Sequence, residues 1–264
     1  MSQSSPRLPA ALNLQGRRVL VTGAASGIGQ ATAMALAQLG AELLLTDRAP
    51  LAETRAQVER IGAACATAEG ELTSDPFIAA LLGHGRINAV AHCAAILESR
   101  PWREDPNWHD RFHRVMDVNV RVPLTLAAAA IDHMAEHGGG AIVLVGSVAG
   151  RTGGTSGFTP PDYAASKGAV HALVKWLSRQ AIGRGVLVNG VAPGPVQTPM
   201  TTGFTSGSQL PLGRSVSHVN SSDGKRVKDP TSRANTWSIE MPARRSVALF
   251  FNRTPVRNVP FARA

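Results

Sequence analysis

Cysteine and aromatic residues are scarce in this 264-residue chain, and it contains no long apolar run. Its two cysteines, Cys65 and Cys93, lie far apart among small or apolar residues, which excludes a disulfide scaffold and a cysteine-based metal site. We expect both to be reduced thiols in the core. No run is long enough for a membrane-spanning helix, and residues 1–18 intersperse Ser, Pro and Arg, so the sequence predicts neither membrane insertion nor secretion. The expected location is the cytoplasm.

Basic residues outnumber acidic ones, but most of the excess lies at one end of the chain. The formal net charge is +9 with neutral histidines. Residues 1–213 hold 17 basic and 15 acidic residues, whereas residues 214–264 hold 10 and 3 and a single leucine, Leu249. We therefore divide the chain into a disordered lead-in over 1–15, a globular domain over 16–213 and a basic irregular tail over 214–264.

The basic tail also raises the hypothesis of a nucleic-acid arm, because Lys225, Arg226 and Lys228 lie close together. Salt-dependent binding would support that hypothesis. The cluster is short and is not accompanied by aromatic residues for base stacking. A solvated tail is therefore the favoured interpretation, and nucleic acid is not an expected partner.

Short apolar runs alternate with helical patterns through the body of the chain. Strands are predicted at 18–22, 42–46, 65–68, 89–93, 141–145 and 186–191, and helices at 27–39, 51–61, after Pro76, at 108–136 and at 161–182. Buried strands separated by helices indicate a parallel sheet covered on both faces. The expected fold is a single α/β domain with a doubly wound parallel sheet of the Rossmann type, and no element is predicted after Thr205.

A glycine-rich turn joins the first predicted strand to the first helix, with Gly23, Gly27 and Gly29 at its core. Glycines let the backbone turn tightly and approach a pyrophosphate at a helix N-terminus. The alternative is a strand-to-helix turn that binds nothing. The required strand and helix flank the turn, so we expect a dinucleotide site.

An acidic residue, Asp47, ends the second predicted strand 18 residues beyond Gly29. An acid at about this distance accepts hydrogen bonds from a ribose hydroxyl, and its charge repels a 2′-phosphate. NAD is therefore the expected cofactor, although the adjacent Arg48 leaves NADP possible. The alternative role for Asp47 is to cap the next helix.

Tyr163, the only tyrosine, precedes Lys167 by four positions at the start of a predicted helix, so both lie on one face. A nearby ammonium favours tyrosinate and is expected to lower the phenol pKa from about 10 towards neutrality. Such a phenol can act as general acid or base between a carbonyl and its alcohol. Taken alone, the pair is more typical of a solvated helix face, and only the other residues of the site favour the catalytic interpretation.

Other polar residues are expected to converge on this pair at the carboxyl edge of the sheet. Ser147 follows the fifth strand, Asn119 lies in the preceding helix, and Pro193 to Thr198 follow the sixth strand. With the glycine turn, the combination resembles a short-chain dehydrogenase/reductase of the classical type, from about Leu14 to Met200. The resemblance implies an oxidoreductase that transfers a hydride between a nicotinamide cofactor and a secondary alcohol or ketone.

The resemblance also implies roles for individual residues. The catalytic tetrad would be Asn119, Ser147, Tyr163 and Lys167: the serine orients the substrate oxygen, the tyrosine exchanges its proton, the lysine also holds the nicotinamide ribose, and the asparagine steadies a water. The implied cofactor contacts are Gly23, Ser26, Gly27, Ile28, Gly29, Asp47, Arg48, Glu71, Leu72, Ala94, Tyr163, Lys167, Pro193, Gly194, Val196 and Thr198. No metal is implied: His109 and His113 lack a third ligand, and we interpret them as a solvated helix face.

Three features depart from the family pattern. The segment His92 to Ala95 replaces Asn-Asn-Ala-Gly, which removes the asparagine that usually braces the sheet, so cofactor affinity is expected to suffer. A spacing of 16 positions between Ser147 and Tyr163 predicts an enlarged loop over 153–161 at the substrate site. The usual last helix and strand are not visible after Arg214.

The C-terminal departure leaves two questions open. Family members are usually homo-oligomers, but without the last strand a weakened or absent oligomer is expected here. An alternative to the enzyme is a cofactor-binding or inactive homologue with a damaged C-terminus. The sequence does not identify the substrate.

Overall fold

The computed structural model describes residues 13–98, 100–154, 159–201, 237–238 and 248–250. Its central sheet contains the six predicted parallel strands in the order β3-β2-β1-β4-β5-β6. The strands are β1 (Arg18–Thr22), β2 (Glu42–Asp47), β3 (Cys65–Glu69), β4 (Ala89–His92), β5 (Gly140–Val145) and β6 (Val186–Val191). This is the strand order of a doubly wound Rossmann-type fold, as the sequence predicted.

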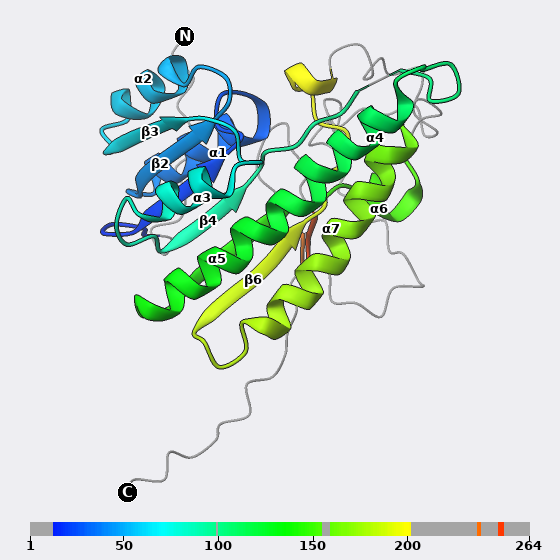
Figure 1. Ribbon diagram of the computed structural model, residues 1–264. Helices are drawn as coiled ribbons and strands as arrows, with labels where there is room; N and C mark the ends of the chain where they lie inside the picture. Colours follow the sequence, from blue (N-terminus) through cyan, green and yellow to red (C-terminus); the bar gives the residue numbers. More distant parts are fainter. Residues whose placement is uncertain (1–12, 99, 155–158, 202–236, 239–247, 251–264) are drawn as a thin grey trace, which may run out of the picture.

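Helices cover both faces of the sheet (Figure 1). The helices are α1 (Gly27–Gln38), α2 (Ala52–Arg60), α3 (Asp75–Leu82), α4 (Trp108–Met116), α5 (Val122–Glu136), α6 (Ala149–Thr152) and α7 (Pro161–Gln180). On one face of the sheet, alternate strand residues pack against α3, α5 and α7 in a first hydrophobic core. On the other face, the remaining strand residues pack against α1 and α2 in a second core. Leu20 belongs to the first core, whereas Val19 and Val21 belong to the second. The strands are therefore continuously apolar because both of their faces are buried.

The sheet order reverses between β1 and β4, since the chain runs outward to β3 before returning to the other side. In an open α/β sheet, the crevice beyond the carboxyl ends of such strands binds ligands. The loops after β1, β4, β5 and β6 all leave at this edge. The fold therefore brings the segments that carry the predicted site residues to one place.

The long helix predicted over 108–136 is interrupted. Between α4 and α5 lies a π-helical turn, η1 (Asp117–Arg121), which carries Asn119. Single π-turns insert an extra residue into a helix and often occur at functional sites. The helix continues directly from α4 through η1 into α5.

The tail contributes two short strands that the sequence did not predict. Strand β8 (Ala248–Phe250) pairs antiparallel with the end of β6, and β7 (Trp237–Ser238) pairs with β8. The rest of 214–264, most of the lead-in and part of the predicted 153–161 loop lie outside the described residues. Among the described helices, none has the length and apolar character that crossing a membrane requires.

Candidate active site

A cavity of about 340 Å³ opens at the carboxyl edge of the sheet. Its lining includes every residue predicted to contact the cofactor, from the glycine turn to Thr198. Ser147, Tyr163 and Lys167 also line it, whereas Asn119 does not. The structure thus brings together residues that follow each of the six parallel strands and residues of α7.

The glycine turn has a steric reason for its glycines. Gly23 has a φ of 66°, and a Cβ there would lie 2.7 Å from the backbone nitrogen of Ala94. A Cβ on Gly29 would lie 2.0 Å from the carbonyl oxygen of Gly23. Only glycine allows β1, the turn and α1 to pack this closely.

The N-terminus of α1 is suited to an anion. The first turn of α1 has no acidic residue, and the side chain of its N-cap residue, Ser26, makes no capping hydrogen bond. The N-terminal amides and the dipole of α1 are therefore not neutralised by an acidic side chain of the helix itself. These features fit the pyrophosphate of a dinucleotide.

Asp47 lies at the rim of the same cavity, directly beside the glycine turn. Its Oδ2 accepts a hydrogen bond of 3.0 Å from the amide of Ala25, and its Oδ1 accepts one of 3.0 Å from Ala49. Arg48, Glu71 and Leu72 line the cavity beside it. The carboxylate is thereby fixed where an adenosine ribose is expected.

Tyr163 and Lys167 share one face of α7, and Ser147 follows β5. Lys167 is buried, and its Nζ donates a hydrogen bond of 3.0 Å to the carbonyl of Val145. The same Nζ lies 5.7 Å from the centroid of the Tyr163 ring. The phenol and the Ser147 hydroxyl share a hydrogen bond. The three groups therefore form one connected cluster in the cavity wall.

The predicted pKa of the phenol is corrected by the structure. Burial raises the pKa of Tyr163, and the hydrogen bond to Ser147 opposes this shift. Burial also lowers the pKa of Lys167 to about 8, opposed by the nearby Cys93. The expectation that Lys167 lowers the pKa of Tyr163 is thus wrong for this structure, because desolvation of the phenol outweighs the stabilisation of its charged form.

Asn119 lies beneath the cavity wall. Its Oδ1 accepts a hydrogen bond of 2.8 Å from the amide of Ile96, and its Nδ2 donates to the Ile96 carbonyl at 2.9 Å. Nδ2 also donates to Ser166 Oγ at 3.1 Å. The side chain therefore holds the segment after β4 against α7, and its predicted role with a water stays a prediction.

His92 forms a hydrogen bond between two strands, at the segment where the sequence lacks the asparagine that is usual in the family. Its Nδ1 is hydrogen-bonded to Thr22 Oγ1 at 2.9 Å, which joins β4 to β1. The same oxygen accepts a hydrogen bond of 3.2 Å from the amide of Ala94. The imidazole thus helps to fix the cavity-lining residue Ala94, and the expected loss of cofactor affinity stays a prediction.

Replacing His92 by asparagine is expected to reduce the loss of stability at acidic pH. Burial, with a smaller effect of Lys167, lowers the pKa of His92 to about 3, whereas an unfolded histidine has a pKa of about 6.5. Within this window the unfolded chain binds a proton that the folded chain does not, so stability falls as the pH falls. At about pH 5 the buried neutral imidazole of His92 therefore lowers the free energy of unfolding by about 2 kcal/mol relative to about pH 8.

Urea unfolding of both proteins at about pH 8 and about pH 5 measures this difference. His92→Asn should lose less stability between the two conditions than the parent. Equal losses would contradict the assignment of a buried neutral imidazole.

Several cavity residues were not predicted. They include Ile96, Leu97, Met200 and Thr201. Ile96 and Leu97 follow the carboxyl end of β4, so their place after a predicted strand was the available signal. Thr201 Oγ1 donates to the Val196 carbonyl at 2.7 Å, a contact within a loop that periodicity does not reveal.

Cys65, His109 and His113 lie outside the cavity lining, whereas Cys93 is part of it. Cys65 and Cys93 are both free thiols of intermediate exposure. His109 and His113 are exposed on α4, which confirms the solvated face. Within the described ranges, no group of three or more His, Cys, Asp or Glu side chains is placed to hold a metal ion.

Comparison with known proteins identifies the family. Residues 17–209 match the family model described as short chain dehydrogenase. The chain belongs to the short-chain dehydrogenase family. Its relative galactitol 2-dehydrogenase (L-tagatose-forming) from Cereibacter sphaeroides is 36% identical over 194 residues, which cover 71% of this chain and 74% of the relative.

Solved structures of the family share the fold. A short chain dehydrogenase from Mycobacterium paratuberculosis, bound to NAD, has a TM-score of 0.65 and 29% identity over 71% of this chain and 75% of its own. A structure from Beutenbergia cavernae with NADP bound at low occupancy has a TM-score of 0.67 and 32% identity, covering 72% and 77%. As a short-chain dehydrogenase, the chain is an NAD(P)-dependent oxidoreductase of alcohols or ketones.

Proposed function

We propose that this short-chain dehydrogenase interconverts a secondary alcohol and its ketone with Tyr163 as general acid and base. The observation that carries the proposal is the connected cluster of Ser147, Tyr163 and Lys167 in the wall of a cavity that also contains the glycine turn. When bound, the nicotinamide supplies the site that accepts or donates a hydride.

Each side chain of the cluster has a proposed task. In the oxidation direction Tyr163 Oη takes the proton of the substrate hydroxyl, and in reduction it returns that proton to the carbonyl oxygen. Ser147 Oγ, already hydrogen-bonded to the phenol, orients the substrate oxygen. The Lys167 ammonium binds the nicotinamide ribose and, in the assembled complex, favours the phenolate.

The proposed role of Tyr163 requires a lower phenol pKa in the complex with cofactor and substrate than in the described structure. In the described structure the pKa of the phenol is raised by burial. Proton abstraction near neutral pH needs the opposite shift, so the positive charge brought close to the phenol in the complex must offset desolvation. Lys167 is the cation already on the same face of α7.

NAD is the proposed cofactor in preference to NADP. The Asp47 carboxylate is fixed at the cavity rim by two backbone amides and carries a charge that repels a 2′-phosphate. Arg48 lines the same rim and would attract such a phosphate. We give the greater weight to Asp47 because its position is held by hydrogen bonds.

Replacing Asp47 by alanine is expected to relax this preference. Loss of the ribose acceptor should weaken NAD binding about tenfold, while loss of the negative charge should strengthen NADP binding. Asp47→Asn removes the charge but keeps an oxygen that can accept from one backbone amide. It therefore distinguishes the effect of the charge from the effect of a disturbed local structure. Glu53→Ala, an exposed acid on α2, is the matched control.

Calorimetric titration with each dinucleotide measures the four proteins. Tighter binding of NADP than of NAD by the unmodified chain would overturn the assignment and favour Arg48 as the determinant.

Substrate screening tests the function itself. The purified full chain is incubated with NAD or NADP and a set of sugar alcohols, simple secondary alcohols and their ketones, and the absorbance of the reduced nicotinamide is followed. Turnover that depends on one of these substrates supports the proposal. Dinucleotide binding without turnover on any of them would contradict it.

A further inference from the structure

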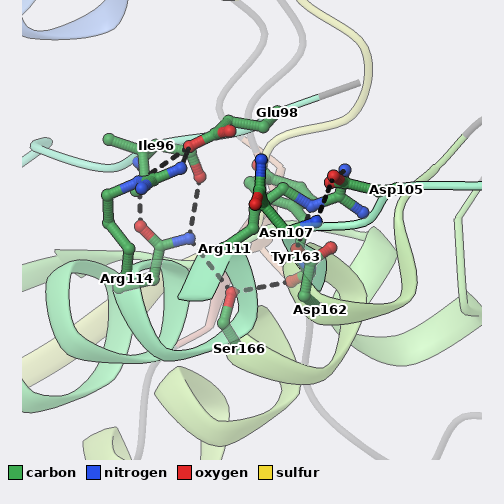
Figure 2. Close-up of polar contacts among 10 residues, drawn as sticks. Ile96, Glu98, Asp105, Asn107, Arg111, Arg114, Asp162, Tyr163 and Ser166 are labelled. Carbon is green, nitrogen blue, oxygen red and sulfur yellow. Dashed lines mark hydrogen bonds and ion pairs between the residues drawn. The ribbon is translucent and has the colours of Figure 1, made fainter. Parts of the chain in front are cut away.

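Three charged side chains form a buried cluster beside the site: Arg111 on α4, Asp105 in the loop before α4, and Asp162 in the first turn of α7. Arg111 Nη1 lies 2.6 Å from Asp105 Oδ2, and Arg111 Nε lies 3.4 Å from Asp162 Oδ2. Their side chains are 1%, 3% and 1% exposed, respectively. Figure 2 shows the cluster next to Tyr163.

Burying three charged side chains costs desolvation free energy, so the place of this cluster beside Tyr163 calls for an explanation. The free-energy cost of removing charges from water is offset only when opposite charges are paired in good geometry. Arg111 is the cation that pairs both carboxylates, and its guanidinium also lies 5.0 Å from the centre of the Trp108 ring. The planar guanidinium can pair two carboxylates in fixed directions, which the flexible ammonium of lysine does less well.

The cluster is connected to the backbone of Tyr163. Asp162 directly precedes Tyr163, and its Oδ1 accepts a hydrogen bond of 2.9 Å from the Tyr163 amide. The other oxygen of the same carboxylate faces Arg111. This contact is an ion pair without a hydrogen bond, because neither Arg111 Nε nor Asp162 Oδ2 has a hydrogen-bond partner. The charge of Arg111 therefore attracts the carboxylate that accepts a hydrogen bond from the amide of the proposed acid-base residue.

A second chain of contacts holds the carbonyl side of the same residue. Ser166 Oγ donates a hydrogen bond of 2.8 Å to the Tyr163 carbonyl and accepts one of 3.1 Å from Asn119 Nδ2. Asn119 in turn binds the backbone of Ile96 in the cavity wall. Arg111 and Asn119 lie on the helix that runs from α4 into η1, and they are thus linked to the amide and to the carbonyl of Tyr163, respectively.

We infer that Arg111 is a positioning residue: through Asp162 it sets the place of Tyr163 in the cavity, and through Asp105 it ties that place to the loop before α4. The inference rests on the proposed function, since it assigns Arg111 to the reaction of Tyr163. A displacement of about 1 Å in a catalytic group can cost about a hundredfold in rate. The cluster therefore affects turnover more than cofactor binding.

Two substitutions test the inference. Arg111→Met removes the shared cation and keeps an unbranched apolar side chain in place of the arginine stem. Asp162→Asn keeps an acceptor for the Tyr163 amide but removes the charge. Both should lower kcat at least about tenfold, with the Kd for the dinucleotide and the KM for the substrate within about threefold of the parent. Arg111→Lys should recover part of the loss because it restores the charge.

The variants need controls for folding. Arg111→Met leaves two buried carboxylates unpaired, so the neutral combination Arg111→Met with Asp105→Asn and Asp162→Asn is measured with it. Arg184→Met breaks an exposed Arg–Asp pair of 2.8 Å between Arg184 and Asp132 and should leave kcat unchanged.

A spectroscopic measurement separates this inference from the proposed function. Tyr163 is the only tyrosine, so carbon-13 labelling of tyrosine gives a single ring signal in the full chain. That signal should shift or broaden in Arg111→Met, in the neutral combination and in Asp162→Asn, but not in Arg184→Met, whether or not a substrate is known.

The outcomes are distinct. A parent protein that turns over no substrate would refute the proposed function. The tyrosine signal would still show whether Arg111 affects the environment of Tyr163. Folded Arg111 and Asp162 variants with parental kcat and an unchanged tyrosine signal would overturn the inference. Reduced melting temperature with unchanged kcat would likewise overturn it, since the cluster would then only stabilise the fold.

Discussion

Tyr163→Phe is expected to lower turnover by about two orders of magnitude or more while retaining dinucleotide binding. The substitution removes the phenolic oxygen and keeps the ring, so the cavity wall and the packing of α7 are preserved. Loss of a general acid or base typically costs a factor of about 10² to 10⁴. Steady-state kinetics together with dinucleotide titration measure both quantities.

The control for this substitution lies on the same helix. Ser178→Ala also removes one hydroxyl from α7, which there donates to the Lys175 carbonyl away from the cavity. Its turnover should stay within about twofold of the parent. If Tyr163→Phe stays within about threefold, less than about 1 kcal/mol of the barrier depends on the phenol and another group must move the proton.

Lys167→Ala is expected to lose both turnover and cofactor affinity, because one ammonium is assigned to the ribose and to the phenol. We expect kcat to fall about a hundredfold and the Kd for the dinucleotide to rise about tenfold. Lys167 is buried and hydrogen-bonded to the Val145 carbonyl, so Lys167→Met, which keeps the volume, accompanies it. Melting curves of both variants show whether the fold survives.

Lys175→Ala is the matched control, since Lys175 is an exposed lysine on the same helix. Parental kinetics are expected for it. A Lys167→Met variant that folds and keeps the parental Kd would show that the ammonium does not bind the cofactor, and parental kcat would remove its role towards Tyr163.

The strands and the glycine turn could be predicted because their signals are local. Residues such as Val19 to Val21 are apolar in succession since both faces of β1 are buried, which distinguishes a parallel sheet from an exposed one. The glycines at 23 and 29 reflect close backbone contacts within a few residues. The spacing of Tyr163 and Lys167 likewise follows from one turn of helix.

Other features depend on contacts between distant segments. Nothing in the local pattern of α4 indicates that Arg111 pairs with a carboxylate on α7, or that the helix contains a π-turn at Asn119. The raised pKa of Tyr163 arises from burial in the assembled cavity, which the spacing to Lys167 did not indicate. The pairing of β8 with β6 joins segments that are remote in the chain, and its own sequence shows no sustained period.

Transfer of deuterium from substrate to cofactor tests the central claim most directly. The full chain is incubated with NAD or NADP and secondary alcohols deuterated at the carbinol carbon, and the reduced nicotinamide is examined by mass spectrometry. We predict that deuterium appears in the reduced nicotinamide with the parent and is strongly diminished with Tyr163→Phe. Bound dinucleotide without deuterium transfer from any alcohol would contradict the account and identify the chain as an inactive cofactor-binding homologue.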